Sequence, residues 1–398
     1  MKNVILFDDR HESFKPLTWT RPVSELRIGI LTIKEKWEKS LGFTVSCQTE
    51  AYLSDKYPIQ YAAQNCLINA TVLPNPELIK EIENLPPNRV LVKGEVAIAL
   101  KVSEEHSKQF FAQQLPTHIK PIETDSEFLQ IQHVWDLFQK NGAALAADFE
   151  LLTAGRNSQP LSSTNRVIGD VNQVFLEEGA SVECAVLNTT NGPIYVGKNA
   201  VIMEGALVRG GLALCEAAQL KMGAKIYGPS TLGPYCKVGG ELTNTVFLGY
   251  ANKGHDGYLG NSVIGEWCNL GADTNSSNLK NNYTKVRVWD YGKQTFAKTD
   301  LQFCGLIMGD HSKAGINTMF NTATVVGVSA NVYGGGFPRT FIPSYTWGGS
   351  KGFMVYRLDK ALETAKIVMK RRNRDLTEVD NAILKYVFEQ TQEYRNWD

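Results

Sequence analysis

One histidine of this chain stands among residues suited to acid–base chemistry. His255 lies in the segment LGYANKGHDGYLGNSV (248–263). An imidazole gains and loses a proton near neutral pH, so it can take a proton from an attacking nucleophile. The sequence therefore predicts that His255 is a general base, with a structural histidine as the alternative. Other polar residues around it or further along the chain are Lys253, Tyr258, Asn269 and Asn278. The alternative for the two asparagines is that they satisfy backbone groups at tight corners.

The elements that position this segment repeat every six residues. From Val196 to Gly249, small or turn-forming residues separate aliphatic ones at a period that fits neither a helix nor an alternating strand. Hexapeptide repeats are typical of a parallel β-helix, in which three hexads make one turn and the aliphatic side chains stack inside. The sequence predicts this inward ladder at Val196, Ile202, Val208, Leu214, Leu220, Ile226, Leu232 and Val238.

The six-residue period has two interruptions. It weakens after Gly249 and returns at Ile264, and it lapses again from about Ser276 to Phe303. A coil can expel an insertion as a loop and resume its register, and such loops often carry function. The second interruption, NNYTKVRVWDYGKQTFAKTD (281–300), is expected to form a β-hairpin. The period then resumes at Met308, Ala314, Phe320, Val326 and Val332.

Strand-like and helix-like segments alternate over roughly the first 150 residues, which predicts an α/β domain with a mainly parallel sheet. Helices are expected within 25–41, 75–84 and 126–140. The segment TAGRNSQPLSST (153–164) has the composition of a linker. From about Phe353 the spacing becomes helical, with Thr377 and Asp380 as a capping pair. The expected parts are therefore an α/β domain (1–152), a linker (153–166), a β-helix (167–348) and C-terminal helices (349–398).

The charge and cysteine content restrict the environment and the partners. The 398 residues include 41 Lys+Arg and 41 Asp+Glu, so no net charge favours nucleic acid or an anionic membrane. Seven cysteines are scattered without a CxxC motif, and no apolar run is long enough for a membrane span. The opening MKNVILFDDRHES carries acids too early for a signal peptide. A cytoplasmic protein with reduced thiols is expected.

The segment around His255 resembles one family. In the bifunctional N-acetylglucosamine-1-phosphate uridylyltransferase and glucosamine-1-phosphate acetyltransferase family, a lysine shortly precedes His-x-x-Tyr-(Leu/Val)-Gly. Asn-(Ile/Leu)-Gly-Ala-Gly-Thr and a further Asn follow. This chain matches that pattern in order and nearly in spacing, with Lys253, His255, Tyr258, Leu259, Gly260, Asn269, Leu270, Gly271, Ala272, Thr274 and Asn278.

The resemblance implies a left-handed β-helix, acetyl-CoA as the donor, and a homotrimer with sites between adjacent coils. It implies that His255 is the catalytic base, that Tyr258 and Asn269 contact the phosphosugar, and that Asn278 lies where sugar and acyl donor meet. Arg209 is expected at the sugar phosphate, although a solvated arginine is the alternative. The acyl-donor groove is expected to be lined by Ala272, Ile316 and Gly334.

This chain departs from the family pattern at several positions. Relatives carry a lysine shortly after the position of Glu241, where this chain has Leu242, Thr243 and Asn244. Asp273 replaces a glycine, and Leu279-Lys280 replaces the usual aromatic residue. Lys253 or Lys280 is expected to supply the missing positive charge at the substrate. The substrate class, a sugar phosphate or a nucleotide sugar, is therefore predicted better than the individual substrate.

The N-terminal segment FDDRHESFKPLTWTRP (7–22) is similar to the opening of sugar-1-phosphate nucleotidylyltransferases. That family has a glycine-rich loop with an arginine, then Pro-Leu-Thr and Pro-Lys, and a later strand whose acid holds magnesium. VLVKGE (90–95) loosely resembles that strand. The loop-side residues that match are Pro16, Leu17, Thr18 and Pro22.

Other N-terminal residues differ from that pattern. Asp8, Asp9 and His11 stand in the glycine-rich stretch, Ser13 replaces the arginine and Val23 the lysine. Acids in a phosphate cradle repel the ligand. One interpretation is that the fold persists without the chemistry. In the other, Glu95 holds Mg²⁺ and positive charge is restored by Arg10, Lys15 and Arg21.

Together these features predict a transferase. The preferred function is an acetyl-CoA-dependent acyltransferase acting on a sugar phosphate or nucleotide sugar, with an impaired nucleotidylyltransferase-like domain. One alternative is a sugar-1-phosphate nucleotidylyltransferase whose β-helix serves assembly. The other is a non-catalytic scaffold that binds sugar nucleotides.

Overall fold

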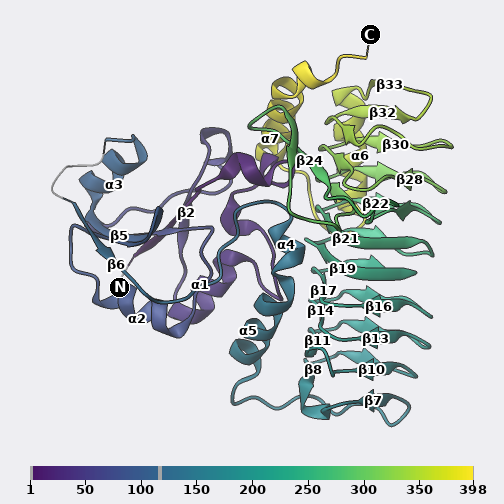
Figure 1. The fold of residues 1–398 in the computed structure, drawn as a ribbon, viewed down its shortest axis with the longest axis horizontal. Helices are drawn as coiled ribbons and strands as arrows, with labels where there is room; N and C mark the ends of the chain where they lie inside the picture. Colours follow the sequence, from purple (N-terminus) through teal and green to yellow (C-terminus); the bar gives the residue numbers. More distant parts are fainter. Residues whose placement is uncertain (1–2, 115–118, 398) are drawn as a thin grey trace. The chain divides into compact units, whose positions relative to one another are not determined.

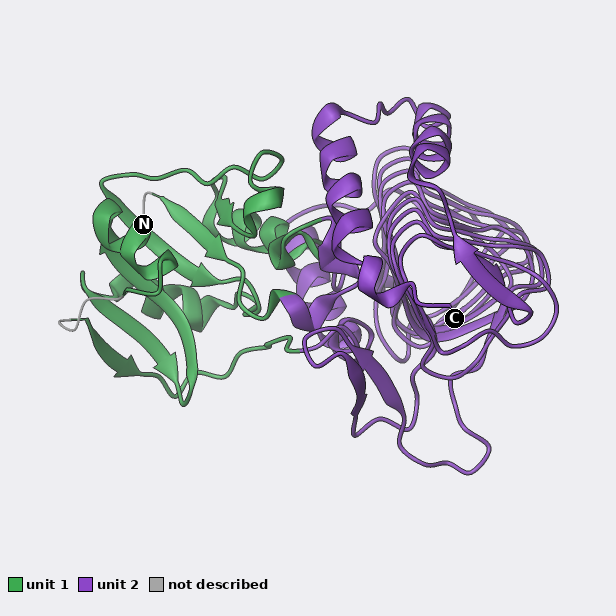
Figure 2. Ribbon diagram, turned by 90° about the horizontal axis from the view of Figure 1, so that it is seen from above, with its two compact units in different colours: residues 1–11, 21–26, 31–132 green, residues 12–20, 27–30, 133–398 purple. Residues whose placement is uncertain are grey.

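The computed structural model describes residues 3–114 and 119–397. The chain divides into two compact units, coloured separately in Figure 2. Unit 1 comprises residues up to His11 together with Arg21–Leu26 and Leu31–Gln132, and unit 2 comprises Glu12–Thr20, Arg27–Ile30 and His133–Asp398. No helix among the described residues is long and apolar enough to cross a membrane.

Unit 1 is built on one six-stranded sheet (Figure 1). Three of its strand pairs are parallel and two are antiparallel, so the sheet is mixed. The second strand of the sheet, β1 (Val4–Phe7), is the apolar run predicted at the start of the chain, and its Val4, Ile5 and Leu6 are buried. In sheet order the strands are β2 (Ser46–Gln48), β1 (Val4–Phe7), β3 (Gln64–Asn69), β5 (Val96–Ser103), β4 (Arg89–Lys93) and β6 (Lys120–Glu123).

Capping residues in the sequence explain where the helices of unit 1 begin. Helix α1 (Ile33–Leu41) begins with a capping box between Thr32 and Glu35 and ends at Gly42 in the left-handed conformation. Asn75 caps α2 (Pro76–Asn84), and Ser103 caps α3 (Glu104–Phe111), each by accepting a backbone N–H with its side chain.

The prediction of one helix over 126–140 is wrong. Only α4 (Asp136–Gln139) forms there, and a longer helix, α5 (Asn141–Thr153), follows it in unit 2. Helix α5 was missed because two of its buried residues are polar. The side-chain oxygen of Asn141 accepts the N–H of Gly29, and the carboxylate of Asp148 accepts the N–H of Ile30, each at 2.7 Å. These polar residues interrupt the apolar stripe that a helix prediction depends on.

A parallel β-helix forms most of unit 2, and its strands stack as successive rungs (Figure 1). The strand pairing divides them among three sides. Side one holds β7 (Arg166–Ile168), β10 (Val186–Asn188), β13 (Leu207–Arg209), β16 (Lys225–Tyr227) and the first halves of β19 (Glu241–Phe247) and β21 (Tyr258–Ile264). Further along, β23 (Asn275–Ser276) pairs with β28 (Met319–Phe320).

Side two takes the second halves of the two long strands. Its other members are β8 (Val174–Leu176), β11 (Ile194–Val196), β14 (Leu212–Leu214), β17 (Ser230–Leu232), β26 (Ile307–Met308), β29 (Val325–Val326) and β31 (Phe341–Ile342). Side three holds β9 (Ser181–Val182), β12 (Val201–Ile202), β15 (Gln219–Leu220), β18 (Lys237–Val238), β20 (Asn252–Lys253), β22 (Asn269–Leu270), β27 (Lys313–Ala314), β30 (Asn331–Val332), β32 (Thr346–Gly349) and β33 (Gly352–Val355).

The predicted inward ladder is the core of this coil. All eight aliphatic residues predicted between Val196 and Val238 are at most 2% exposed, and the resumed positions Met308, Phe320, Val326 and Val332 are also buried. Figure 2 views the coils along the stack, where successive rungs superpose. The predicted fold class, an α/β domain followed by a parallel β-helix and terminal helices, is confirmed.

The second interruption forms the predicted hairpin, with β24 (Arg287–Asp290) antiparallel to β25 (Thr295–Lys298). Its aromatic residues pack within the same chain: Trp289 stacks on Phe341 at 4.0 Å, and Tyr291 meets Phe341 and Tyr394 edge-on. The chain ends in α6 (Leu358–Lys370) and α7 (Glu378–Gln390), and Thr377 and Asp380 form the predicted capping box of α7.

Candidate functional site

His255 lies in a groove along one corner of the β-helix. The corner joins side three to side one, and the groove spans several successive coils with a volume of about 480 Å³. Two residues predicted for the acyl-donor groove, Ala272 and Ile316, line the same space. Its other lining residues are Lys221, Met222, Gly239, Gly240, Gly254, Asp256, Asp273 and Asn317. We call this space the corner groove.

The groove is hollowed because one corner is short. Four residues separate β15 from β16 and β20 from β21, but only Gly239 and Gly240 separate β18 from β19. Gly240 has φ +74°, and a Cβ there would come within 2.8 Å of the Lys253 ammonium and 2.7 Å of the Gly257 carbonyl oxygen. Only glycine fits this crowded left-handed position.

The coil does not break at His255 as the sequence pattern suggested. Inward positions continue at Phe247, Lys253, Leu259 and Ile264, because β20 and β21 pair in register with their neighbours. Lys253 is 0% exposed and pairs with Val238 on the inward ladder of side three. The period seemed to weaken because a lysine replaces an aliphatic residue.

The Lys253 ammonium is held by backbone oxygens of two corners. Nζ donates to the carbonyl oxygen of His255 at 2.9 Å and to that of Gly239 at 3.2 Å. Burial lowers the pKa of Lys253 to about 8, and the nearby carboxylates of Asp256 and Asp273 act in the opposite direction. Lys253 is therefore covered by the loop that carries His255 and does not face solvent.

The His255 side chain is exposed on the loop Gly254–Gly257, above the buried lysine. The next coil supports this loop: the N–H of Asp273 donates to the carbonyl oxygen of Asp256 at 3.1 Å. The rim of the groove thus combines an imidazole, two carboxylates and the cation Lys221. Such a rim can accept a proton from a bound nucleophile and has room for an extended ligand along the corner.

Tyr258 and Asn278 are brought together on side one, as the resemblance implied for a shared substrate. The Asn278 Nδ2 donates to the Tyr258 hydroxyl at 2.9 Å and to Oδ1 of Asn261 at 2.8 Å. Burial raises the pKa of Tyr258. Since both amide hydrogens of Asn278 are used, its side-chain oxygen remains as the group that could accept a bond from a ligand.

Sequence reasoning missed the supporting asparagines. Asn244 and Asn261 each turn the corner between side one and side two with φ of +47° and +48°. In the orientation of the Asn244 amide that gives both its nitrogen and its oxygen a partner, the nitrogen donates to the backbone carbonyl oxygen of Phe138 at 2.7 Å. The oxygen accepts from Nδ2 of Asn261 at 3.1 Å. The available signal was a single asparagine at equivalent places in two successive coils.

The other predicted site residues lie elsewhere on the coil. Asn269 is exposed on side three, outside the corner groove, and Arg209 is exposed on side one in β13. Gly334 lines a second cavity of about 350 Å³, together with the β32–β33 hairpin. That cavity follows the same corner, because Gly334 comes just after β30 of side three, as Gly254 comes just after β20.

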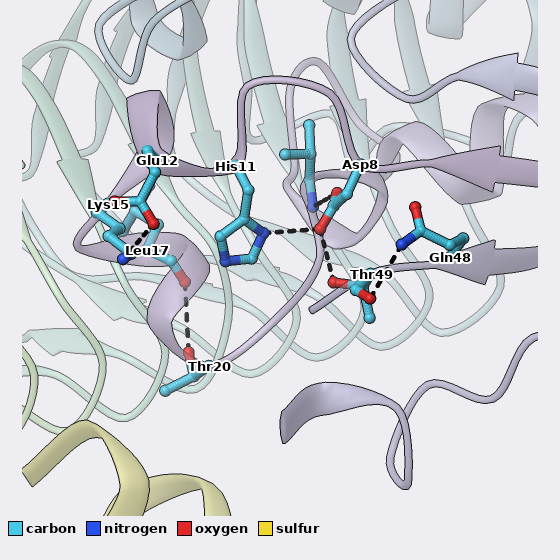
Figure 3. Close-up of polar contacts among 9 residues, drawn as sticks. Asp8, His11, Glu12, Lys15, Leu17, Thr20, Gln48 and Thr49 are labelled. Atoms are coloured by element: carbon cyan, nitrogen blue, oxygen red, sulfur yellow. Dashed lines mark hydrogen bonds and ion pairs between the residues drawn. The ribbon is translucent and has the colours of Figure 1, made fainter. Parts of the chain in front are cut away.

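In unit 1, Asp8 and Asp9, which stand where a glycine-rich loop was expected, form hydrogen bonds with other residues of this chain; Figure 3 shows those of Asp8. The Asp8 carboxylate accepts the N–H of Val23 at 2.6 Å, the Thr49 hydroxyl at 2.6 Å and Nδ1 of His11 at 2.7 Å. Asp9 accepts from the Asn69 amide at 3.1 Å. The Asp8 side chain is 3% exposed, so it serves as an anchor of the loop that follows β1.

Replacing Asp8 by alanine is expected to destabilise unit 1 by about 2–4 kcal/mol, because three partly buried donors would lose this acceptor. Denaturant unfolding followed by fluorescence measures the change. Asp9→Ala is the matched control, since it removes one longer bond and should cost about 1 kcal/mol. Equal midpoints for Asp8→Ala and the unmodified chain would contradict the anchoring role.

The residues predicted for nucleotide and magnesium binding differ in their exposure and contacts. Arg10 is exposed with φ +59°, Lys15 pairs with Glu12 and lies 3.5 Å from the Trp19 ring, and Arg21 is 5% exposed. Glu95 is exposed at the turn between β4 and β5. In the described part of the chain, no group of three or more His, Cys, Asp or Glu side chains could hold a metal ion. The role of Glu95 at a magnesium ion stays a prediction.

Comparison with known proteins finds one family model and several similar proteins. Residues 4–157 match the family model described as sugar nucleotidyl transferase. The chain is 33% identical over 87 residues (22% of this chain) to "Bifunctional protein GlmU" of Methanocaldococcus jannaschii. It is 27% identical over 154 residues (34% of this chain) to "Bifunctional sugar-1-phosphate nucleotidylyltransferase/acetyltransferase" of Sulfurisphaera tokodaii. It spans 21% of the first relative's length and 38% of the second's.

Among solved structures, an Arabidopsis UDP-N-acetylglucosamine acyltransferase matches with 14% identity and a TM-score of 0.24, over 60% of this chain and 99% of that one. The resemblance recognised from the sequence is confirmed by the sequence comparisons. The N-terminal part matches the sugar nucleotidyl transferase family model, and the chain is similar to proteins named as bifunctional sugar-1-phosphate nucleotidylyltransferase/acetyltransferases.

Proposed function

We propose that the β-helix is an acyltransferase that moves an acetyl group from acetyl-CoA to a sugar phosphate or nucleotide sugar. The observation that carries the proposal is the corner groove, where exposed His255 stands beside Ala272 and Ile316. The similarity to curated acetyltransferases supports the same reaction class.

In the proposed reaction, the acceptor nucleophile attacks the thioester carbonyl carbon while His255 takes the proton from the nucleophile. The carbonyl oxygen becomes an oxyanion, which requires a hydrogen-bond donor facing it. Collapse breaks the carbon–sulfur bond and releases the CoA thiolate, which receives the proton held by His255. The products are the acetylated sugar and free CoA.

The donor is proposed to lie along the corner. Ala272 and Ile316 line the groove beside His255, and Gly334 lines the next cavity along the same corner. The acceptor is proposed to meet Tyr258 and Asn278, with Asn269 and Arg209 in outer positions. We also propose a homotrimer, in which an adjacent coil supplies the missing wall of the open groove; light scattering of the purified chain tests the oligomeric state.

A thiol-release assay tests the proposed function. Wild-type protein, acetyl-CoA and a panel of amino-sugar phosphates and nucleotide sugars should release CoA thiol only when the correct acceptor is present. The acetylated product should gain 42 Da, a mass that follows from the chemistry of acetylation. Absence of thiol release over the whole panel would reject acetyl transfer to this substrate class.

Nucleotidyl transfer by the N-terminal domain is the second candidate, and the family match over residues 4–157 favours it. The internal bonds of Asp8 argue against a free phosphate cradle at this loop. Pyrophosphate release from a nucleoside triphosphate and a sugar-1-phosphate, lost in Glu95→Ala and kept in His255→Ala, would establish this activity. Saturable binding without either turnover would instead indicate a scaffold.

A further inference from the structure

Lys253 is a charged residue at a position that the coil reserves for aliphatic side chains. On the inward ladder of side three it follows Leu220 and Val238 and precedes Leu270, and all four are at most 2% exposed. Burying an ammonium costs several kcal/mol unless its hydrogen bonds are made. An aliphatic residue would fill this rung at no such cost, so the lysine needs another explanation.

The hydrogen bonds of the Lys253 ammonium suggest what this lysine does. It leaves the core at the short corner, where Gly239 and Gly240 provide room, and donates to the carbonyl oxygens of Gly239 and His255. The second bond, at 2.9 Å, reaches the backbone of the residue proposed as the base. One side chain thus ties the floor of the groove to the loop above it.

A comparable arrangement occurs at a second histidine. Lys313 donates through Nζ to the carbonyl oxygen of His311 at 2.8 Å, again two residues away. Lys313, however, points outward from its rung, whereas its neighbour Ala314 takes the inward position. Of the two lysines, only Lys253 binds the carbonyl oxygen of its histidine from an inward position of the coil.

We propose that Lys253 is a positioning residue, whose buried ammonium holds the backbone of His255 and thereby sets the loop Gly254–Gly257 over the corner groove. This inference rests on the proposed function for its effect on turnover, but the positioning itself does not depend on any activity. It replaces the expectation, taken from the family resemblance, that Lys253 contacts the substrate.

Lys253→Met tests the proposal, because methionine is unbranched and apolar and suits the ladder. We expect the variant to fold with a midpoint equal to or above that of the wild type, since a buried charge is replaced by an apolar side chain. We expect amide hydrogen exchange at 254–257 to become at least 10-fold faster. We expect kcat for acetyl transfer to fall at least 10-fold, with the KM for acetyl-CoA changed less than 3-fold.

Leu270→Met is the matched control, since it puts the same side chain on the next rung without touching the loop. It should leave hydrogen exchange at 254–257 within 2-fold of the wild type. If Lys253→Met also leaves that exchange unchanged, the positioning role is overturned. If the exchange rises but the wild type shows no acetyl transfer, positioning stands and the proposed function fails.

A variant that cannot fold is also informative. Lys253→Gln keeps an N–H donor on a shorter side chain and serves as the second variant. If both Lys253→Met and Lys253→Gln fail to fold, the lysine is required by the coil itself, and the positioning role is overturned. If Lys253→Gln folds with hydrogen exchange closer to the wild type than Lys253→Met, the donated bond is the cause.

The same lysine predicts a pH dependence of stability. Its pKa is about 8 in the folded chain, below the ordinary value of 10.5, so between these values the unfolded chain binds more protons. The penalty of the buried charge is therefore fully present below pH 8 and is relieved as the pH rises towards 10.5. The unfolding free energy of the wild type, relative to Lys253→Met, should increase across this window. The groups facing the ammonium, Asp256 and Asp273, are the same in both proteins.

Discussion

Replacement of His255 by alanine is expected to lower kcat for acetyl transfer by roughly 100- to 10,000-fold, the usual contribution of a positioned general base. The KM for acetyl-CoA should change little, because the imidazole is proposed to contact the acceptor nucleophile. Stability should stay within about 0.5 kcal/mol, since the side chain is exposed. The thiol-release assay and thermal unfolding measure the two effects.

Met222→Ala is the matched control for His255→Ala. Met222 lines the same groove and is 70% exposed, but its thioether cannot accept a proton at neutral pH. Its truncation should raise the KM a few-fold at most and leave kcat nearly unchanged. An equal loss of kcat in both variants would mean that the groove needs bulk at its rim, and His255 would no longer be assigned as the base.

The sequence was sufficient to predict the coil, because each inward position contributes one side chain to a continuous core. Residues such as Leu214 and Val238 recur every six positions, and every one predicted is buried. The capping box of Thr377 and Asp380 at the start of α7 could also be predicted from the sequence, since it depends only on residues three positions apart.

The parts that could not be predicted depend on residues far apart in the sequence. Lys253 resembles a break in the repeat until the strand pairing shows it on the ladder beside Val238. Helix α5 carries Asp148 and Asn141 inside because these side chains accept N–H groups of Ile30 and Gly29, more than a hundred residues away. A single-sequence pattern holds no signal for such partners.

The site was predicted in part for the same reason. The resemblance singled out His255, Ala272 and Ile316, and these residues share the corner groove, although their roles remain predictions. The hollow itself arises from the two-residue corner at Gly239 and Gly240, and only comparison with the four-residue corners of neighbouring coils makes it visible. Corner length therefore carries information that the six-residue period does not.

Gly257→Ala is expected to disable the loop that carries His255. Gly257 has φ +115°, and a Cβ there would lie 2.3 Å from the carbonyl oxygen of Thr274. That oxygen belongs to the backbone of the next coil, which is held in place because the N–H of Thr274 donates to the carbonyl oxygen of Gly271. The Thr274 carbonyl therefore cannot move away easily from an added methyl group. Since the conformation is also unfavourable for any residue with a side chain, we expect a loss of about 2–4 kcal/mol in stability.

Gly254→Ala changes the other end of the same loop and separates the two explanations for any loss of turnover. A Cβ on Gly254 would have no neighbouring atom within 4 Å, and its φ is not left-handed, so stability should change by less than about 0.5 kcal/mol. If the loop must keep its backbone path for His255 to act, Gly257→Ala should lose at least 10-fold in kcat while Gly254→Ala retains most of it. Wild-type turnover and stability in Gly257→Ala would show that the loop can re-form around an added methyl group, and the requirement for glycine at position 257 would be withdrawn.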